Sequence, residues 1–185
     1  MVNAVRKQIA AASLAVAFLS VSGPAARAME LTSPDFSNGA RLTPAQVHTR
    51  CGGLNRSPAL HWSGAPAGTR SLAVTLFDSD AGGGTGFWHW LVFDIPAGTL
   101  DLPENAGAGN GLPSGAEQAI NDFGKSGYGG ACPPPGSGVH HYEFTLYALG
   151  VQRVPFGADA KGTNLAAYLK GHALASASLA GIYSR

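Results

Sequence analysis

Charged residues are scarce in this 185-residue chain, which has 12 Lys and Arg, 11 Asp and Glu, and a formal net charge of +1. Charged side chains make up 12% of the sequence and hydrophobic ones 45%, so there is enough apolar material for a folded core. Nucleic-acid-binding domains need an excess of positive charge to neutralise phosphates, and this composition lacks it. We therefore predict that nucleic acid is not a partner.

Cysteine is also rare: Cys51 and Cys132 are the only two in the sequence. They lie far apart without a Cys-x-x-Cys spacing, which argues against a zinc site. In an exported protein an even pair favours a disulfide, and two buried free thiols are the alternative. The HExxH, DxH and GxSxG signatures are also missing, so we predict no cofactor, no bound metal and no catalytic residue.

The long apolar run of a signal peptide occurs at the start of the chain. Arg6 and Lys7 precede the apolar segment Ile9–Val21, and Ala26-Arg27-Ala28 follows it with small residues at the expected cleavage positions. This pattern predicts a signal peptide over residues 1–28, cleaved near Ala28, with an uncleaved helix as the alternative. Residues 29–185 then form one domain without an integral membrane segment, located in the periplasm or secreted.

Short apolar runs bounded by glycine and proline predict a mainly β fold with one helix. Strands are expected at 71–77, 87–95, 141–149 and 173–184, and shorter ones at 31–36, 57–62 and 116–121. Pro58 predicts that 57–62 is an edge strand, whereas residues 96–115 have the composition of a surface loop without a core face. The helix is expected at Asn164–Gly171, with Thr163 as its N-cap and Gly171 as its end.

The two strands within 71–96 carry the polar residues of most interest. Asp78 and Asp80 follow the first strand and share one face of an extended chain. His89 stands between Trp88 and Trp90, and in a regular strand it points to the opposite face from both. Because polar groups at the rim of an apolar sheet are costly without partners, this cluster indicates a binding site. Taken singly, the alternatives are a solvated loop that carries Asp78 and Asp80, and a core histidine with satisfied hydrogen bonds at His89.

Six sequence motifs occur here in an order known from one protein family. They are SPALHW at 57–62, DSDA at 78–81, WHWLVFDIP at 88–96, NDFG at 121–124, GYGGACPPPG at 127–136 and HHYEFTLYAL at 140–149. On these motifs the chain resembles the phosphatidylethanolamine-binding protein family, and within it the bacterial Raf-kinase-inhibitor-like branch. The resemblance covers nearly all of residues 29–185.

The resemblance implies a large antiparallel sheet packed on a smaller one, short peripheral helices including one near the C-terminus, and an anion-binding pocket at one end. It assigns ligand binding to Asp78, Asp80, His89, Cys132, Pro133, His140 and Tyr142. It also implies that both cysteines flank the pocket, where a disulfide between Cys51 and Cys132 would brace the loop. Bacterial members of the family are often dimers, so a homodimer is a further possibility from the resemblance.

One loop departs from the family pattern. The family sequence there is usually DPDAP, whereas this chain has Asp78-Ser79-Asp80-Ala81-Gly82, followed by two more glycines. Because proline fixes φ, the loss of both prolines is expected to loosen the loop and to change the geometry of the pocket more than the fold.

Two carboxylates are unusual neighbours for an anion. We expect the aspartates to accept hydrogen bonds from His89 and His140, which orients both rings as donors and raises their pKa values. The alternative is that one aspartate holds a proton and donates it directly. Backbone N–H groups of the glycine-rich loop and of the loop at 132–136 would add further donors.

Three functions are compatible with these residues. The first is an exported, non-catalytic protein that binds a small anion such as phosphate or a phospholipid headgroup. The second is an interaction protein that inhibits a protease or a kinase, as some members of the family do. The third is a metal-dependent phosphoester hydrolase, since Asp78, Asp80, His89 and His140 are residue types that bind divalent metals.

Overall fold

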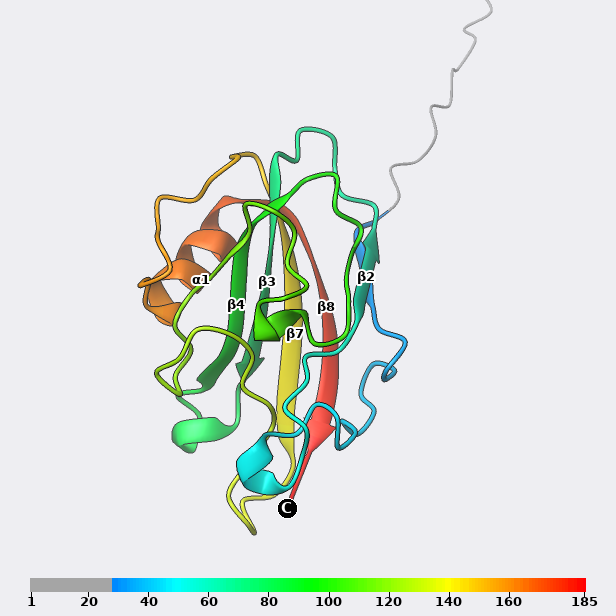
Figure 1. The fold of residues 1–185 in the computed structure, drawn as a ribbon, viewed down its shortest axis with the longest axis vertical. Helices are drawn as coiled ribbons and strands as arrows, with labels where there is room; N and C mark the ends of the chain where they lie inside the picture. Colours follow the sequence, from blue (N-terminus) through cyan, green and yellow to red (C-terminus); the bar gives the residue numbers. More distant parts are fainter. Residues whose placement is uncertain (1–27) are drawn as a thin grey trace, which may run out of the picture.

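The chain folds into two antiparallel β-sheets and one α-helix, as a computed structural model that describes residues 28–185 shows (Figure 1). The predicted signal peptide, residues 1–28, lies outside the described residues except for Ala28. The predicted mainly β fold class is confirmed, with a large sheet packed on a smaller one.

The larger sheet has five strands in the order β6-β4-β3-β7-β8. The strands span Glu117–Gln118 (β6), Phe87–Pro96 (β4), Ser71–Asp78 (β3), His140–Leu149 (β7) and Ala173–Tyr183 (β8). The long strands are rich in β-branched and aromatic residues, which favour a pleated and partly buried surface. The four long predicted strands are therefore present within one residue of their expected ends, but the strand expected at 116–121 has only two residues.

The smaller sheet has the order β1-β2-β5, with strands at Glu30–Thr32 (β1), Leu60–Ser63 (β2) and Asp101–Leu102 (β5). The prediction of an edge strand at 57–62 is wrong, because β2 is the central strand and Pro58 lies before it. The prediction that 96–115 lacks a core face is also wrong. Leu102 and Ala106 of this segment are fully buried, and β5 pairs with β2.

The helix α1 spans Gly162–His172, so it starts two residues earlier than predicted and continues beyond Gly171. Its N-cap is Lys161 rather than Thr163, and no side chain caps this end. Gly162 allows the first turn to approach β4 closely, because a Cβ at this position would lie 2.9 Å from Cγ of Trp88. Close packing against the sheet therefore places the start of the helix, which the capping residues alone did not predict.

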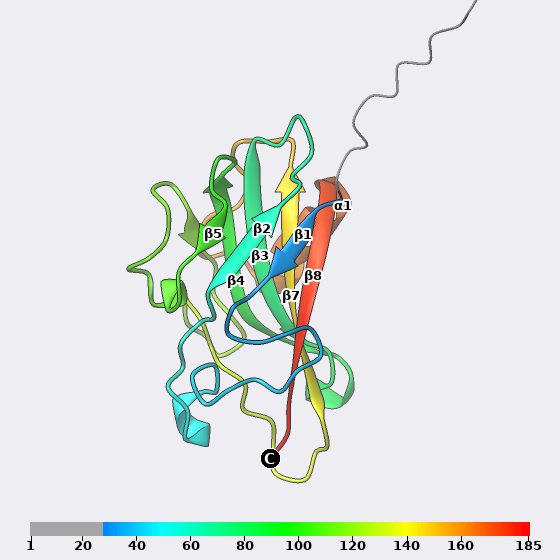
Figure 2. The ribbon, with the colours of Figure 1, turned by 90° about the vertical axis from the view of Figure 1, so that its right-hand side faces the viewer.

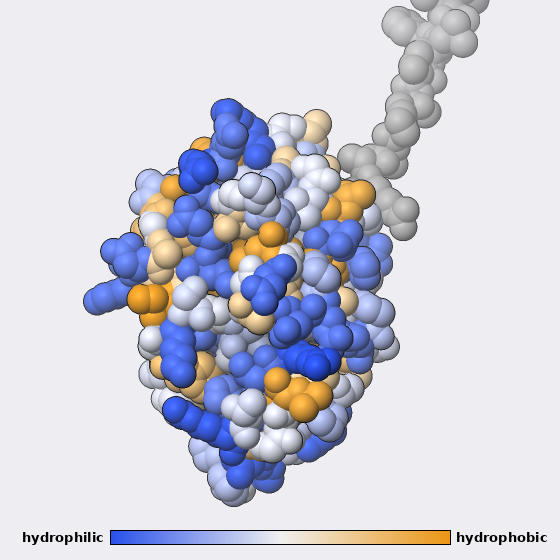
Figure 3. Space-filling model, in the orientation of Figure 1, coloured by the Kyte–Doolittle hydropathy of each residue, from blue (hydrophilic) through white to orange (hydrophobic). Residues whose placement is uncertain are grey.

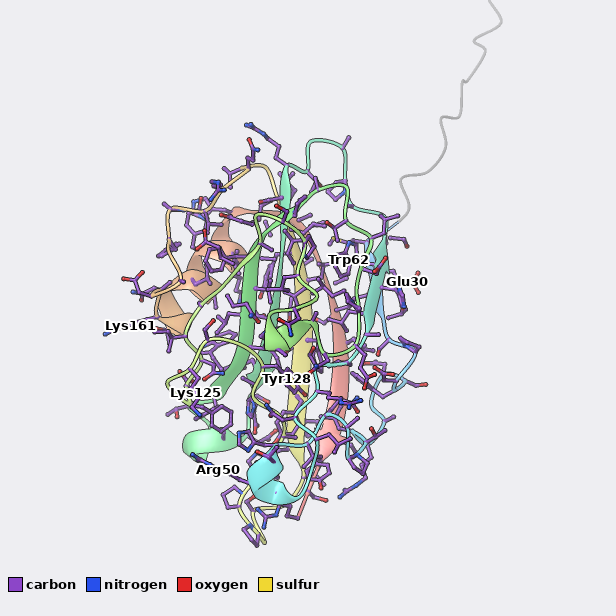
Figure 4. The ribbon with its side chains drawn as sticks, viewed as in Figure 1. Glu30, Arg50, Trp62, Lys125, Tyr128 and Lys161 are labelled. Carbon is purple, nitrogen blue, oxygen red and sulfur yellow. A yellow bond between two sulfur atoms is a disulfide. The ribbon has the colours of Figure 1, made fainter. Side chains whose placement is uncertain are left out.

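The two faces of the large sheet are covered by different elements. Figure 2 shows β1, β2 and β5 in front of the large sheet, with α1 behind it. One apolar cluster joins the two sheets and includes Leu60, Trp62 and Tyr128, whereas a second cluster packs Leu165 and Leu169 of α1 on the other face. Figure 4 shows Trp62 beside β2 and Tyr128 over the large sheet. β3 and β4 are therefore buried on both faces, whereas β7 and β8 leave part of the face beside α1 exposed.

Three short 3₁₀ turns complete the described elements: η1 (Thr49–Cys51), η2 (Ala81–Gly83) and η3 (Ala106–Ala108). In Figure 1, η1, η2, the loop before β7 and the C-terminus all lie at the lower end of the molecule.

Hydrophobic residues on the face seen in Figure 3 form separate small patches among hydrophilic ones. Within residues 28–185, none of the helices has the length and apolarity needed to span a bilayer.

Candidate functional site

A cavity of about 510 Å³ opens at the end of the large sheet where η2 and the loop before β7 meet. All seven residues that the sequence resemblance assigned to ligand binding line it. The complete lining is Asp78, Asp80, Ala81, Gly82, Gly83, Phe87, His89, Phe123, Cys132, Pro133, Pro134, Ser137, His140 and Tyr142. The structure therefore brings together β3, β4, β7 and two loops, which are far apart in the sequence.

Asp78 ends β3 and is the buried centre of the site. Its Oδ1 accepts hydrogen bonds from the backbone N–H groups of Asp80, at 3.0 Å, and Ala81, at 3.2 Å. Its Oδ2 lies 2.8 Å from Nδ1 of His140 and 3.9 Å from Nε2 of His89. Because two backbone N–H groups and Nδ1 of His140 donate to its two oxygens, the carboxylate is held in one orientation at the floor of the cavity.

Asp80 has a different partner from the predicted one. Its Oδ2 accepts from the backbone N–H of His141 at 2.8 Å and lies 2.9 Å from Nδ1 of the same residue. These hydrogen bonds hold the pKa of Asp80 below its ordinary value. The prediction that both aspartates orient His89 and His140 therefore holds for Asp78 and His140, whereas Asp80 binds the exposed His141 at the rim.

His89 reaches the cavity because β4 is irregular at this point. Leu76 of β3 pairs with Trp90 and the next residue, Phe77, pairs with Trp88, so His89 is an extra residue in β4. Such bulges turn a side chain out of its regular alternation. Trp90 consequently lies in the cluster between the sheets and Trp88 in the cluster under α1, so the two tryptophans do not share a face as the regular strand predicted.

His89 is buried and carries a specific hydrogen bond. Its Nδ1 lies 2.7 Å from the carbonyl oxygen of Gly129, so Nδ1 holds a proton and Nε2 points toward Asp78 and the cavity. Burial lowers the pKa of His89, and this outweighs the opposing effects of the Gly129 carbonyl and the Asp78 carboxylate. The prediction of a raised pKa is wrong for His89, because desolvation dominates at this depth.

His140 lies between two polar partners. Its Nδ1 contacts Asp78, as described above, and its Nε2 lies 3.0 Å from Oγ of Ser137. The same Oγ lies 2.8 Å from the carbonyl oxygen of Pro134. Ser137 was not among the predicted site residues. It lies in a loop between two glycines, where no strand or helix periodicity indicates which way its side chain faces.

Tyr142 presents a polar atom that the protein leaves without a partner. The side chain is fully buried, and its hydroxyl has no hydrogen-bond partner of acceptable geometry. Burial raises the pKa of Tyr142, and the charge of the Asp78 carboxylate and its polar interaction with the hydroxyl raise it further, so the hydroxyl keeps its proton. An unpaired buried hydroxyl is costly. A ligand in the cavity would supply the missing acceptor.

Aromatic rings form one wall of the cavity, and the sequence did not identify them as site residues. The rings of Phe87 and Phe123 pack edge to face with their centroids 4.7 Å apart, and the centroids of the Phe123 and His89 rings are 5.3 Å apart. Oδ1 of Asn121 accepts from the backbone N–H of Phe123 and fixes the turn that carries the ring. The NDFG motif at 121–124 was the available signal, since an Asx-type turn directs the following aromatic residue.

A disulfide joins Cys51 of η1 to Cys132 of the cavity wall, with their Cα atoms 5.6 Å apart. This bond connects the two loops that flank the site, as the resemblance implied. Among residues 28–185, no group of three or more His, Cys, Asp and Glu side chains is arranged to hold a metal ion.

The family model for phosphatidylethanolamine-binding proteins matches residues 32–184. The chain is 43% identical over 175 residues to UPF0098 protein YbcL of Escherichia coli, covering 92% of this chain and 95% of that protein. It is 42% identical over 159 residues to UPF0098 protein YbhB of the same organism, covering 84% of this chain and the whole of that protein. A Mycobacterium tuberculosis protein whose name, LppC, classes it with lipoproteins is 41% identical over 136 residues, covering 73% of this chain and 63% of the relative.

The fold is also similar to that of a solved relative. The crystal structure of Escherichia coli YbcL, described as a member of the mammalian PEBP family, superposes with a TM-score of 0.83 at 42% identity. The superposition covers 86% of this chain and 99% of the YbcL chain. The two-sheet architecture and the segments that form the cavity are therefore those of a known fold.

Proposed function

This chain belongs to the phosphatidylethanolamine-binding protein family, and on that premise we propose that it binds a small anion in the cavity at Asp78. The ligand carries a phosphate-like group, either free or as the headgroup of a lipid. The buried hydroxyl of Tyr142 is the observation that carries the proposal, because it leaves a hydrogen-bond donor without an acceptor beside two histidines.

The carboxylate of Asp78 does not prevent an anion from binding. Backbone N–H groups and His140 already donate to both of its oxygens, so its charge is partly compensated. Nε2 of His89 is without a proton while the ring is neutral, because Nδ1 donates to Gly129. An anion at this position favours protonation of His89, and the imidazolium then donates from Nε2 to the ligand.

Positive charge near the cavity supports the same ligand class. Arg50 of η1 and Lys125 line a neighbouring groove that shares Phe123 with the cavity, and Figure 4 shows both at the lower part of the molecule. Together with burial, these two cations lower the pKa of His48, which lines the same groove. Such a field attracts anions toward the opening beside Phe123.

We further propose that the protein acts outside the cytoplasm, after cleavage of residues 1–28. The bond between Cys51 and Cys132 fits an oxidising compartment. The name of the relative LppC supports export in this family as well.

Calorimetric titration with inorganic phosphate and with phosphoethanolamine tests the proposal. Replacing Tyr142 with Phe removes one hydrogen bond to the ligand and is expected to weaken binding by about 1 to 2 kcal/mol. Tyr147→Phe is the matched control, because Tyr147 lies on the same strand but lines a groove on the other face of the sheet. Equal affinities of the two variants and the wild type would reject a role for Tyr142, and absence of saturable binding to the wild type would reject the proposal.

A further inference from the structure

Three polar side chains in the cavity form a continuous hydrogen-bonded series. Oδ2 of Asp78 lies 2.8 Å from Nδ1 of His140, and Nε2 of His140 lies 3.0 Å from Oγ of Ser137. Asp78 and His140 are buried, whereas Ser137 is exposed on the loop before β7 and lines the cavity. The accessible hydroxyl of Ser137 therefore lies within hydrogen-bond distance of the buried His140 imidazole, which the Asp78 carboxylate orients.

The hydrogen bonds define the protonation pattern of this series. Asp78 accepts from two backbone N–H groups through Oδ1, so it acts as an ionised acceptor, and Nδ1 of neutral His140 must hold the proton that it shares with Oδ2. Nε2 then carries a lone pair directed at Ser137. The single proton of the Ser137 hydroxyl has two acceptors within reach, Nε2 of His140 and the carbonyl oxygen of Pro134.

We propose that Ser137 is a nucleophile, with His140 as its general base, in an acyl-transfer reaction on small carboxylic esters that fit the cavity. A nucleophile within hydrogen-bond reach of a base, with the base oriented by a third group, is the geometric signature of this chemistry. The serine lies between Gly136 and Gly138 rather than in a GxSxG motif, so sequence patterns do not identify it. The inference goes beyond anion binding and adds a reaction to a site that the sequence predicted to be non-catalytic.

The reaction balances with water as the only co-reactant. Oγ of Ser137 attacks the ester carbonyl carbon while its proton moves to Nε2 of His140, and the carbonyl oxygen becomes an oxyanion. The tetrahedral intermediate collapses, the C–O bond to the alcohol breaks, and His140 returns the proton to the departing alkoxide. Water then attacks the acyl-serine ester with His140 again as base, which releases the carboxylic acid and restores Ser137. Asp78 stabilises the imidazolium in both steps and is a positioning residue.

One donor that lines the cavity is available for the oxyanion. The hydroxyl of Tyr142 lines the same cavity without a partner. A donor of this kind stabilises the charge that develops in the transition state. A cavity that accepts a tetrahedral phosphate also suits a tetrahedral acyl intermediate.

The direct test is labelling with a fluorophosphonate, which forms a bond from an activated serine oxygen to phosphorus with loss of fluoride. Mass spectrometry of peptides is expected to find the label on Ser137 of the wild-type protein. Ser137→Ala abolishes this label, and His140→Gln slows labelling by a factor of about 100 or more. Ser79→Ala is the matched control and labels like the wild type, because Ser79 is exposed on the neighbouring loop and does not contact His140.

Hydrolysis of p-nitrophenyl acetate by the same four proteins is a second measurement, and the variants are expected to rank in the same order. The thermal unfolding midpoint of each variant, measured in parallel, shows whether it stays folded, and binding of inorganic phosphate to the wild type shows that the cavity is accessible. A wild-type protein that binds phosphate but is not labelled at Ser137 would overturn the inference and leave anion binding intact. Labelling of His140→Gln at the wild-type rate would overturn it as well, since the histidine would then play no part as a base.

Discussion

The carboxylate of Asp78 lies 2.8 Å from Nδ1 of His140, although 62 residues separate the two in the sequence. β3 and β7 are neighbours in the large sheet, and Asp78 pairs directly with Tyr142, two residues after His140. The strand register therefore brings the acid, the imidazole and the unpartnered hydroxyl of Tyr142 to one end of the sheet. The chemistry that we propose for this site depends on that register.

Replacing Asp78 with Asn is expected to lower the free energy of unfolding by about 2 kcal/mol. The amide has one acceptor oxygen where the carboxylate has two, so either His140 or the backbone N–H groups of Asp80 and Ala81 lose their acceptor. Urea denaturation measures the change. Asp101→Asn, at an exposed position of β5, is the control, and an equal effect of both substitutions would contradict the role of Asp78.

Removing the disulfide is expected to lower the free energy of unfolding by about 4 kcal/mol, because the bond closes a loop between residues 81 positions apart. The variant Cys51→Ala with Cys132→Ala makes the change without free thiols. Denaturation of the variant and of the oxidised wild type compares the two stabilities. Phosphate titration of the folded variant then shows whether the bond also holds the cavity wall in place. An unchanged denaturation midpoint would contradict the stabilising role of the bond.

Stability is expected to fall as the pH drops below 6.5, because burial lowers the pKa of His89 in the folded protein. The unfolded chain takes up a proton at the ordinary pKa of 6.5, before the folded chain does, so acid favours unfolding. The effect is absent above pH 6.5 and complete below the folded pKa of His89. Burial also lowers the pKa of His48, which adds to the trend.

Thermal unfolding at about pH 7.5 and at about pH 5.5 measures this dependence. His89→Gln is expected to reduce the difference between the two melting temperatures, whereas His61→Gln, at an exposed position of β2, leaves it unchanged. A pH dependence that survives unaltered in His89→Gln would show that the protonation of His89 is not its source.

Restoring proline at position 82, where the family pattern has it, is expected to destabilise this protein. Gly82 has φ of 60°, in the left-handed region that proline does not reach, and Gly83, Gly84 and Gly86 also have positive φ. Gly82→Pro therefore lowers the free energy of unfolding by more than about 1 kcal/mol. Gly98→Ala, where an added Cβ meets no atom within 4 Å, is the control. A neutral Gly82→Pro variant would show that the loop adopts the family conformation in solution.

The sequence predicted the positions of the strands more accurately than the contacts of the site residues. Continuous apolar runs identified β3 and β4, whose central residues are buried on both faces. Alternation identified β7, which is buried on one face and partly exposed on the other. The bulge at His89 could not be predicted, since it depends on the register between β3 and β4. β2 was misassigned as an edge strand because Pro58 lies near it in the sequence, although the strand begins only at Leu60.

Side-chain partners were the least predictable part of the site. The motifs identified Asp78 and Asp80 together, but the turn after β3 directs them to His140 and His141 respectively. The pKa of His89 was expected to rise beside a carboxylate, and only the depth of burial shows that desolvation dominates. Ser137 could be recognised as a site residue only from the structure, in which its hydroxyl lies beside Nε2 of His140.

Native mass spectrometry of the protein, presented with excess inorganic phosphate or phosphoethanolamine, tests the central claim most directly. The wild-type protein is expected to carry one ligand in the cavity at Asp78, and His89→Ala is expected to lose it, because Nε2 of His89 no longer donates to the anion. A wild-type protein that carries no more of either ligand than His89→Ala would contradict the account of this cavity as an anion-binding site.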